Sequence, residues 1–310
     1  MKKLLAPLLA AVLLSGFASP AFAQGVVIMP DSTNNRLVAF DPMNGALLTS
    51  NMFSLVAGST PIHAIQVGNE IWISEQIGDR VSRWALDGTF LGQIGGGPTG
   101  GLDNVRGMAV IGDTVYVTNG GTANGSPGAN SVVMYSTAGA FVGSFQTTAL
   151  APSPFGILAH QGGILVSSSS GGDDIHRFTL LGTSLGTFHN STSLNFVEQL
   201  AFATNGSILT VGFSTNNIAY LDPNTGALVS SFAAPGARGV YQLGNGNVLW
   251  TSGAGTFIYD VLSGTSSQVY AGGGRYLEFA PVPEPSSLLA CITGGGILLL
   301  ALRRRNRNRP

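Results

Sequence analysis

The chain has 310 residues, of which 9% are charged, 44% are hydrophobic and 44 are glycine. So few charges exclude a long solvated helix or coiled coil, because soluble domains average about a quarter charged residues, and the hydrophobic fraction excludes general disorder. The single cysteine, Cys291, excludes an intramolecular disulfide and a thiolate metal cluster. We therefore expect a packed core held by hydrogen-bonded elements and many tight turns.

Residues 1–23 have the pattern of a secretory signal peptide. Lys2 and Lys3 precede an apolar run from Leu4 to Phe17, and Ala21-Phe22-Ala23 follows as a small-x-small site. We predict export through the Sec translocon and cleavage before Gln24. The alternative, an uncleaved N-terminal anchor, is disfavoured because the run is short for a membrane span.

The body, residues 24–281, repeats about every 43 residues, the length of a four-stranded propeller blade. A turn followed by an alternating strand occurs six times, and glycine in these turns supplies the positive φ that a short hairpin needs. The near copies are Asp41 to Leu48 and Asp222 to Val229, and the looser ones are Leu86 to Leu91, Thr137 to Val142, Leu180 to Leu185 and Val261 to Thr265.

Two further strand types also occur six times. One is rich in Val, Ile and aromatic residues and comprises Val26 to Met29, Glu70 to Ser74, Thr114 to Thr118, Gly163 to Ser167, Ser207 to Val211 and Asn247 to Thr251. The other comprises Ile62 to Val67, Arg106 to Ile111, Phe155 to His160, Glu198 to Ala203, Arg238 to Leu243 and Arg275 to Ala280.

This repetition predicts an all-β fold, a six-bladed β-propeller, with five or seven blades left as alternatives. The strand ending at Ala280 has no partner after it, and the blade beginning at Gly25 lacks an innermost strand, so the C-terminal strand is expected to close the ring. Trp72, Trp84 and Trp250 lie within strands and should pack between sheets. The body resembles the NHL and YVTN-type propellers and, more distantly, the SMP-30/gluconolactonase group, a resemblance of blade rhythm that implies a fold and no single function.

Aligned innermost strands place six residues at equivalent entry positions around one mouth of the channel: His63, Arg106, Phe155, Glu198, Arg238 and Arg275. Arginine presents a planar fork to carboxylate or phosphate, so this ring is a candidate site for an anionic or polyhydroxylated ligand. The alternative is a solvated ring in which Glu198 only pairs with a neighbouring arginine.

Other polar groups have simpler interpretations. Asp173, Asp174 and His176 suit a metal ion, but Asp174 shares its repeat position with Asn35, Asp79, Asn130 and Asn217, which favours turn chemistry. Residues 120–130 form a Gly/Asn/Ser/Pro-rich insertion, expected as a long exposed loop. The chain contains no nucleophile elbow, zinc-protease motif or P-loop, so we predict no catalytic residue, metal or cofactor.

The C-terminal residues 282–310 form a three-part pattern. Val282-Pro283-Glu284-Pro285 leads into the largely uncharged residues 286–302, a predicted transmembrane helix, and five arginines follow: Arg303, Arg304, Arg305, Arg307 and Arg309. The pattern resembles the PEP-CTERM sorting signal of Gram-negative bacteria. The resemblance implies recognition by an exosortase, a membrane-embedded cysteine peptidase, and an exopolysaccharide context. A plain tail anchor is the alternative.

Between the two terminal segments the body has seven arginines, no lysine and fourteen acidic residues. Its net charge near −7 excludes binding to nucleic acid through phosphate neutralisation. We therefore expect a non-catalytic binding or structural protein of the cell envelope or extracellular matrix, with an inner-membrane-anchored precursor. The alternative is a metal-dependent, lactonase-like hydrolase or lyase at the channel mouth, with Asp103 and Asn104 near Glu198.

Overall fold

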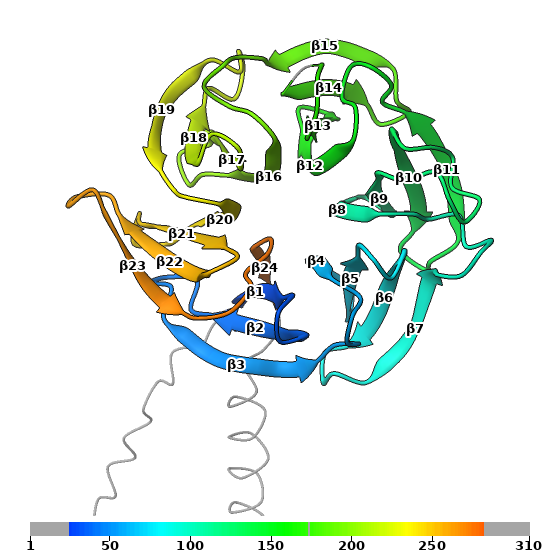
Figure 1. The fold of residues 1–310 in the computed structure, drawn as a ribbon, viewed down its shortest axis with the longest axis horizontal. Coiled ribbons are helices and arrows are strands. Elements are labelled where there is room, and N and C mark those ends of the chain that lie inside the picture. The colour runs from blue at the N-terminus through cyan, green and yellow to red at the C-terminus, as the bar shows by residue number, and fades with distance from the viewer. Residues whose placement is uncertain (1–24, 173, 282–310) are drawn as a thin grey trace, which may run out of the picture. The chain divides into compact units, whose positions relative to one another are not determined.

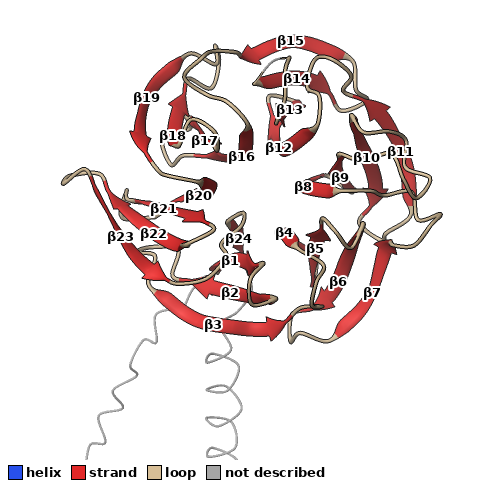
Figure 2. Cartoon of the chain, viewed as in Figure 1, coloured by secondary structure: helices blue, strands red, loops and turns tan. Residues whose placement is uncertain are grey.

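The computed structural model describes residues 25–172 and 174–281, and these residues make one compact unit. Six four-stranded antiparallel sheets are arranged around a central axis, which confirms the predicted six-bladed β-propeller (Figure 1). Only strands and loops occur in the described ranges (Figure 2).

The predicted terminal segments lie outside those ranges. They are the signal peptide, the Val282-Pro283-Glu284-Pro285 motif, the transmembrane helix and the arginine cluster. Within residues 25–172 and 174–281, no helix is long and apolar enough to span a membrane.

The strands of each blade follow one another from the axis outward, except that the last strand of the chain begins the first blade. Blade 1 comprises β24 (Glu278–Ala280), β1 (Val26–Asp31), β2 (Arg36–Phe40) and β3 (Leu47–Ser54); blade 2, β4 (Pro61–Val67), β5 (Glu70–Glu75), β6 (Arg80–Ala85) and β7 (Phe90–Gly95); blade 3, β8 (Val105–Ile111), β9 (Thr114–Asn119), β10 (Ser131–Ser136) and β11 (Phe141–Gln146); blade 4, β12 (Pro154–His160), β13 (Gly163–Ser168), β14 (Ile175–Thr179) and β15 (Ser184–His189); blade 5, β16 (Val197–Phe202), β17 (Ile208–Gly212), β18 (Asn217–Leu221) and β19 (Leu228–Ala233); and blade 6, β20 (Ala237–Gln242), β21 (Val248–Ser252), β22 (Gly255–Asp260) and β23 (Thr265–Tyr270).

The hydrophobic core lies between neighbouring sheets. The second strand of each blade is buried on both faces because another blade packs against each side, as β1 and β13 show along their whole length. This explains why these segments are nearly continuous apolar runs. The outermost strands, such as β19, are mostly exposed. Trp72, Trp84 and Trp250 are buried, as predicted.

The C-terminal strand closes the ring, again as predicted. β24 pairs with β1 through Val26–Ala280, Val27–Phe279 and Ile28–Glu278, and an isolated bridge joins Asp31 to Gly274. Closure of this kind joins the two ends of the body by a backbone ladder and leaves no open gap between the first and last blades.

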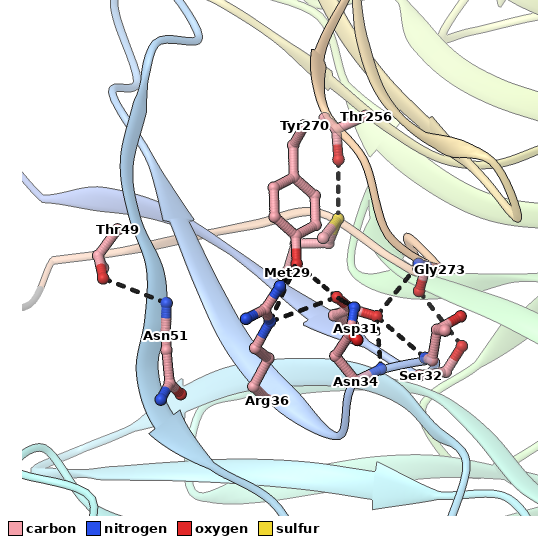
Figure 3. Close-up of polar contacts among 11 residues, drawn as sticks. Met29, Asp31, Ser32, Asn34, Arg36, Thr49, Asn51, Thr256, Tyr270 and Gly273 are labelled. Carbon is pink, nitrogen blue, oxygen red and sulfur yellow. Dashed lines mark hydrogen bonds and ion pairs between the residues drawn. The ribbon is translucent and has the colours of Figure 1, made fainter.

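A polar network around Asp31 strengthens the closure (Figure 3). The buried Asp31 carboxylate accepts hydrogen bonds from the Tyr270 hydroxyl at 2.5 Å and from the backbone N–H groups of Thr33 and Gly273 at 2.9 and 3.1 Å. Asn34 donates to it from backbone and side chain, and Arg36 lies 3.5 Å away. Burial acts to raise the pKa of Asp31, but the hydrogen bonds from Asn34, Tyr270 and Thr33 outweigh it and lower the pKa.

Candidate functional site

The candidate site is the channel mouth at which the innermost strands begin. In five blades the innermost strand carries a bulge after its first residue. In blade 6, for example, Ala237 pairs with Ser252 and Gly239 pairs with Thr251. Arg238 lies between two residues whose partners are consecutive, so it is the extra residue of the bulge. In blade 1 the corresponding residue follows the Asp31–Gly274 bridge. The six residues at this position, called here the mouth ring, are Ile62, Arg106, Phe155, Glu198, Arg238 and Arg275.

The predicted register was therefore wrong by one residue in blade 2. Pro61 pairs with Glu75 and His63 with Ser74, so Ile62 occupies the mouth ring and His63 lies one residue further along the channel. The imidazole of His63 is buried, and its Nδ1 accepts the backbone N–H of Met108 at 3.0 Å. The same bulge occurs in blades 3 to 6, and the predicted strand of blade 2 begins at Ile62, so the error came from assigning the position to the polar neighbour of an apolar residue. The other five predicted residues do lie in the mouth ring.

Glycine next to the mouth ring allows neighbouring innermost strands to approach closely. A Cβ atom added to Gly107, Gly156 or Gly239 would lie 2.4, 2.2 or 2.3 Å from the backbone oxygen of the mouth-ring residue in the next blade. Hydroxyl groups bond to these same oxygens: Ser167 donates to the carbonyl of Glu198 at 2.8 Å, and Thr118 to that of Phe155 at 2.7 Å. The mouth ring is thus held at fixed positions by backbone contacts between blades.

Glu198 is the one carboxylate of the mouth ring, and it is fully buried. Its Oε1 accepts a hydrogen bond from Arg238 Nη1 at 2.7 Å, whereas its Oε2 is buried and has no hydrogen-bond partner among the described residues. Burial raises the pKa of Glu198 to about 7, against the attraction of Arg238, Arg275 and Arg106. The carboxyl group therefore changes its charge near neutral pH.

Arg106 has a structural role in the mouth. Its Nη1 donates to the carbonyls of Ser153 and Pro154 and to the Ser153 hydroxyl at 2.9 to 3.1 Å, and its guanidinium lies 3.9 Å from the centre of the Phe155 ring. Burial lowers the pKa of Arg106 to about 10, which still leaves it charged at neutral pH. These contacts join blade 3 to blade 4.

Arg238 and Arg275 retain donors for a ligand. Within residues 25–172 and 174–281, Arg238 donates only through Nη1 to Glu198, and Arg275 only through Nε to Ser32 at 2.9 Å. Burial, followed by repulsion from Arg238, lowers the pKa of Arg275. Two neighbouring guanidinium groups thus share a single carboxylate, an arrangement that favours an added anion.

Aromatic side chains complete the wall of the mouth. Arg238 lies 4.4 Å from the centre of the Phe213 ring, which contacts Phe196 at 5.2 Å, and Phe196 in turn contacts Phe155 at 5.1 Å. Tyr276 is buried, and its hydroxyl has no hydrogen-bond partner among the described residues. Burial, followed by the negative charge of Glu198, raises its pKa well above the ordinary value. Sequence reasoning missed Tyr276, although it directly follows a predicted site residue.

One position in the turn between the second and third strands uses Asp or Asn to hold the loop that enters the next blade. Asp79, Asn130 and Asp174 each accept a backbone N–H from the loop that enters the next blade, at 2.9, 2.7 and 2.7 Å. The shared position of these residues was predicted, but the sequence did not reveal that they bond to the following loop. No group of three or more His, Cys, Asp or Glu that could hold a metal ion occurs among the described residues.

The side chains of Asp103 and Asn104 accept hydrogen bonds close to the insertion at residues 120–130. Asp103 accepts the backbone N–H of Ala123 at 2.6 Å, and Asn104 accepts hydrogen bonds from Gln76 and Arg106. The insertion follows β9 and therefore lies on the same face as the mouth ring. It is attached to blade 2 as well, because Asn124 donates to Asp79 at 2.9 Å.

Comparison with known proteins supports the fold and leaves the family open. No protein-family model matches the chain, and no curated protein matches it significantly. Among solved structures, it is similar to a chain of a nidogen/laminin complex (13% identity, 82% of this chain and 98% of that chain, TM-score 0.65). It is also similar to a protein of unknown function from Bacteroides caccae (14%, 84% and 96%, TM-score 0.54) and to a virginiamycin B lyase from Staphylococcus aureus (17%, 67% and 69%, TM-score 0.50).

Proposed function

We propose that this chain is an exported, non-catalytic binding protein of the bacterial cell envelope, and that an anionic ligand binds at the mouth ring. One observation carries the proposal. Arg238 and Arg275 present guanidinium N–H groups that have no partner among the described residues, next to a single buried carboxylate. A carboxylate or phosphate accepts two parallel hydrogen bonds from such a group and relieves the repulsion between the two cations.

The charge distribution of the body supports an acidic ligand specifically at this place. The body as a whole is acidic, so an anion is repelled from most of its surface and is attracted only where arginines gather. Phe196 and Phe213 are half-buried, and their rings suit the apolar face of a sugar ring. An acidic exopolysaccharide combines both chemistries and agrees with the sorting pattern predicted for residues 282–310.

Binding of acidic oligosaccharides to the full-length protein tests this proposal. We expect a uronate-containing oligosaccharide to bind, and its carboxyl-reduced counterpart to bind at least about tenfold more weakly. The double variant Arg238→Gln/Arg275→Gln should lose this preference. Arg177→Gln removes a positive charge from β14 outside the mouth ring and serves as the matched control. Equal affinity of wild type and double variant for the acidic ligand would refute the proposal.

An enzyme at the same mouth is the second candidate, and the pKa of Glu198 favours it. A carboxyl group with a pKa of about 7 is matched to proton transfer at neutral pH, as general acid–base catalysis requires. A metal-dependent mechanism is disfavoured because Arg106, Arg238 and Arg275 surround Glu198 with positive charge and repel a cation. Turnover of an acidic oligosaccharide that is lost in Glu198→Gln would favour the enzyme over the binding protein.

A further inference from the structure

A cavity lies at the end of the channel opposite the mouth ring. It has a volume of about 360 Å³ and is lined by the ends of the innermost strands β4, β8, β12 and β24. These strands run from the mouth ring to this end, so the two sites lie at opposite faces of the propeller. The volume falls within the range of small-molecule pockets. We call it the exit cavity.

About half of the wall of the exit cavity is apolar. Ile65, Met108, Leu158 and Phe279 contribute aliphatic, thioether and aromatic surface. Phe279 is 41% exposed although it is large and apolar. A ligand with a hydrocarbon body would remove this surface from water, which is favourable in proportion to the area covered.

A carboxylate also lines the exit cavity. Glu278 lines the exit cavity, and its Oε2 lies 3.3 Å from Nε2 of His63. Because Nδ1 of His63 accepts the backbone N–H of Met108, the ring proton is on Nε2 and the imidazole is the neutral tautomer. His63 therefore donates one hydrogen bond to Glu278 without neutralising its charge.

Gln66 adds a second acceptor. Its Nε2 donates to the carbonyl of Gly68 at 2.9 Å, and its Oε1 is buried and has no hydrogen-bond partner among the described residues.

The turns between the third and fourth strands of each blade lie at the same face of the propeller as the exit cavity, because neighbouring strands are antiparallel. Four of these turns carry an aspartate: Asp41, Asp87, Asp222 and Asp260. This acidic face raises the local concentration of cations.

We propose that the exit cavity binds an organic ammonium ion. The ammonium group donates to the Glu278 carboxylate and to Oε1 of Gln66, and the hydrocarbon body packs against Met108, Leu158 and Phe279. An anion is repelled by Glu278, and a hydrated inorganic cation gains nothing from the apolar wall. The site is independent of the proposed ligand at the mouth ring.

Calorimetric titration of the full-length protein in a non-ionic detergent tests this site, with the detergent-only titration subtracted. The probes are hexylamine, hexan-1-ol and hexanoate at pH 7.5, where the amine is protonated. We expect hexylammonium to bind at least about tenfold more tightly than hexanol, since a hydrogen bond to a charged group exceeds a neutral one by roughly that factor. Hexanoate should not bind.

Two variants locate the site, and a third controls for charge. Glu278→Gln keeps the shape of the side chain and should lower hexylammonium affinity about tenfold, and Ala159→Leu should abolish binding by filling the cavity. Asp113→Asn removes an exposed carboxylate of the β8–β9 turn on the same face, outside the cavity, and should leave affinity unchanged. Near-ultraviolet circular dichroism establishes that each variant is folded.

Three results would overturn the proposal: no binding of hexylammonium to the wild type, equal affinity for hexylammonium and hexanol, or an equal loss in Glu278→Gln and Asp113→Asn. The wild-type comparison of probes requires no variant and stands even if a variant unfolds. Binding of the uronate oligosaccharide at the mouth ring should be unchanged in Glu278→Gln, so failure of one site is distinguishable from failure of the other.

Discussion

Oε1 of Glu198 lies 2.7 Å from Nη1 of Arg238, while the second oxygen of the same buried carboxylate has no hydrogen-bond partner among the described residues. One oxygen of this carboxylate thus gains a hydrogen bond from a cation, and the other loses its hydration without replacement. The raised pKa of Glu198 follows from that imbalance, because burial favours the neutral form more than the nearby guanidinium groups favour the charged form.

Anion binding at the mouth should weaken as the pH rises from 6 to 8. Below a pKa of about 7 the neutral Glu198 leaves Arg238 uncompensated, and above it the carboxylate partly cancels the charge that attracts the ligand. We expect the affinity for an acidic oligosaccharide to fall about tenfold across this range, as a coupling of one pKa unit implies. Titration calorimetry at several pH values measures it. Glu198→Gln should remove the dependence, and a dependence that persists in that variant would exclude Glu198 as its source.

Removing the hydroxyl of Tyr276 should stabilise the protein. The oxygen is buried without a hydrogen-bond partner in the described part of the chain, so Tyr276→Phe should raise the free energy of unfolding by about 1 kcal/mol. Tyr270→Phe is the matched control with the opposite sign, because its hydroxyl donates to Asp31 and that bond is lost. Chemical denaturation of both variants gives the two values. Destabilisation of equal size in both would show that the Tyr276 hydroxyl is bonded in solution.

Asp31→Asn should weaken the closure of the ring. The substitution removes the charge on which Tyr270, Gly273 and Arg36 converge, and breaking one side of such a buried network costs about 3 kcal/mol. Asp222→Asn, in an exposed hairpin turn, should lower stability much less. Urea denaturation followed by tryptophan fluorescence compares them, and similar losses in the two variants would contradict a closing role for Asp31.

Asp31 should also make the free energy of unfolding depend on pH in the acidic range. The pKa of Asp31 is lowered on folding, so its contribution is complete above the pKa of the unfolded chain, about 3.9. It is lost as the pH falls through the lower pKa of the folded state. The stability difference between wild type and Asp31→Asn should therefore shrink below about pH 4. Thermal unfolding midpoints between pH 3 and 7 measure this, and a constant difference would contradict the lowered pKa.

Gly156→Ala should destabilise the mouth ring. The new methyl group would lie 2.2 Å from the backbone oxygen of Glu198, so blades 4 and 5 must separate locally at a cost of about 2 kcal/mol. Gly253→Ala, where nothing lies within 4 Å of the new atom, is the control and should have little effect. Guanidinium denaturation tests both, and equal stability of the two variants would show that the inner strands adjust without cost.

Deleting residues 283–310 should convert the protein from an envelope-retained to a freely secreted species, because the predicted sorting segment is then absent. Cys291→Ser keeps all three parts of that segment and should retain the wild-type distribution. Cell fractionation with intact-mass spectrometry distinguishes these outcomes. A mature species running from Gln24 to near Pro285, dependent on an exosortase-like peptidase, is expected. Retention of the final arginines with and without that peptidase would leave a plain tail anchor.

The blade count, the strand positions and the closing strand could be predicted because they depend on a pattern that recurs six times along the chain. The mouth ring was predicted at five positions and missed at Ile62, because an apolar residue gives no sign that it lies at a polar mouth and its neighbour His63 was assigned there instead. Tyr276 was missed because three other blades have glycine at its position. The Asp31–Tyr270 pair joins residues 239 positions apart, and no local pattern reports such a contact.

The position of β24 has a mechanical consequence. If the chain is held by its C-terminus, tension reaches the body first through the three residue pairs between β24 and β1, beginning at Val26 and Ala280. Antiparallel strands loaded at one end separate one pair after another. The Asp31 network lies beyond those three pairs and would be the next point of resistance. In an anchored molecule, the strand pairing that closes the ring would then also be the part of the fold that resists the pulling force.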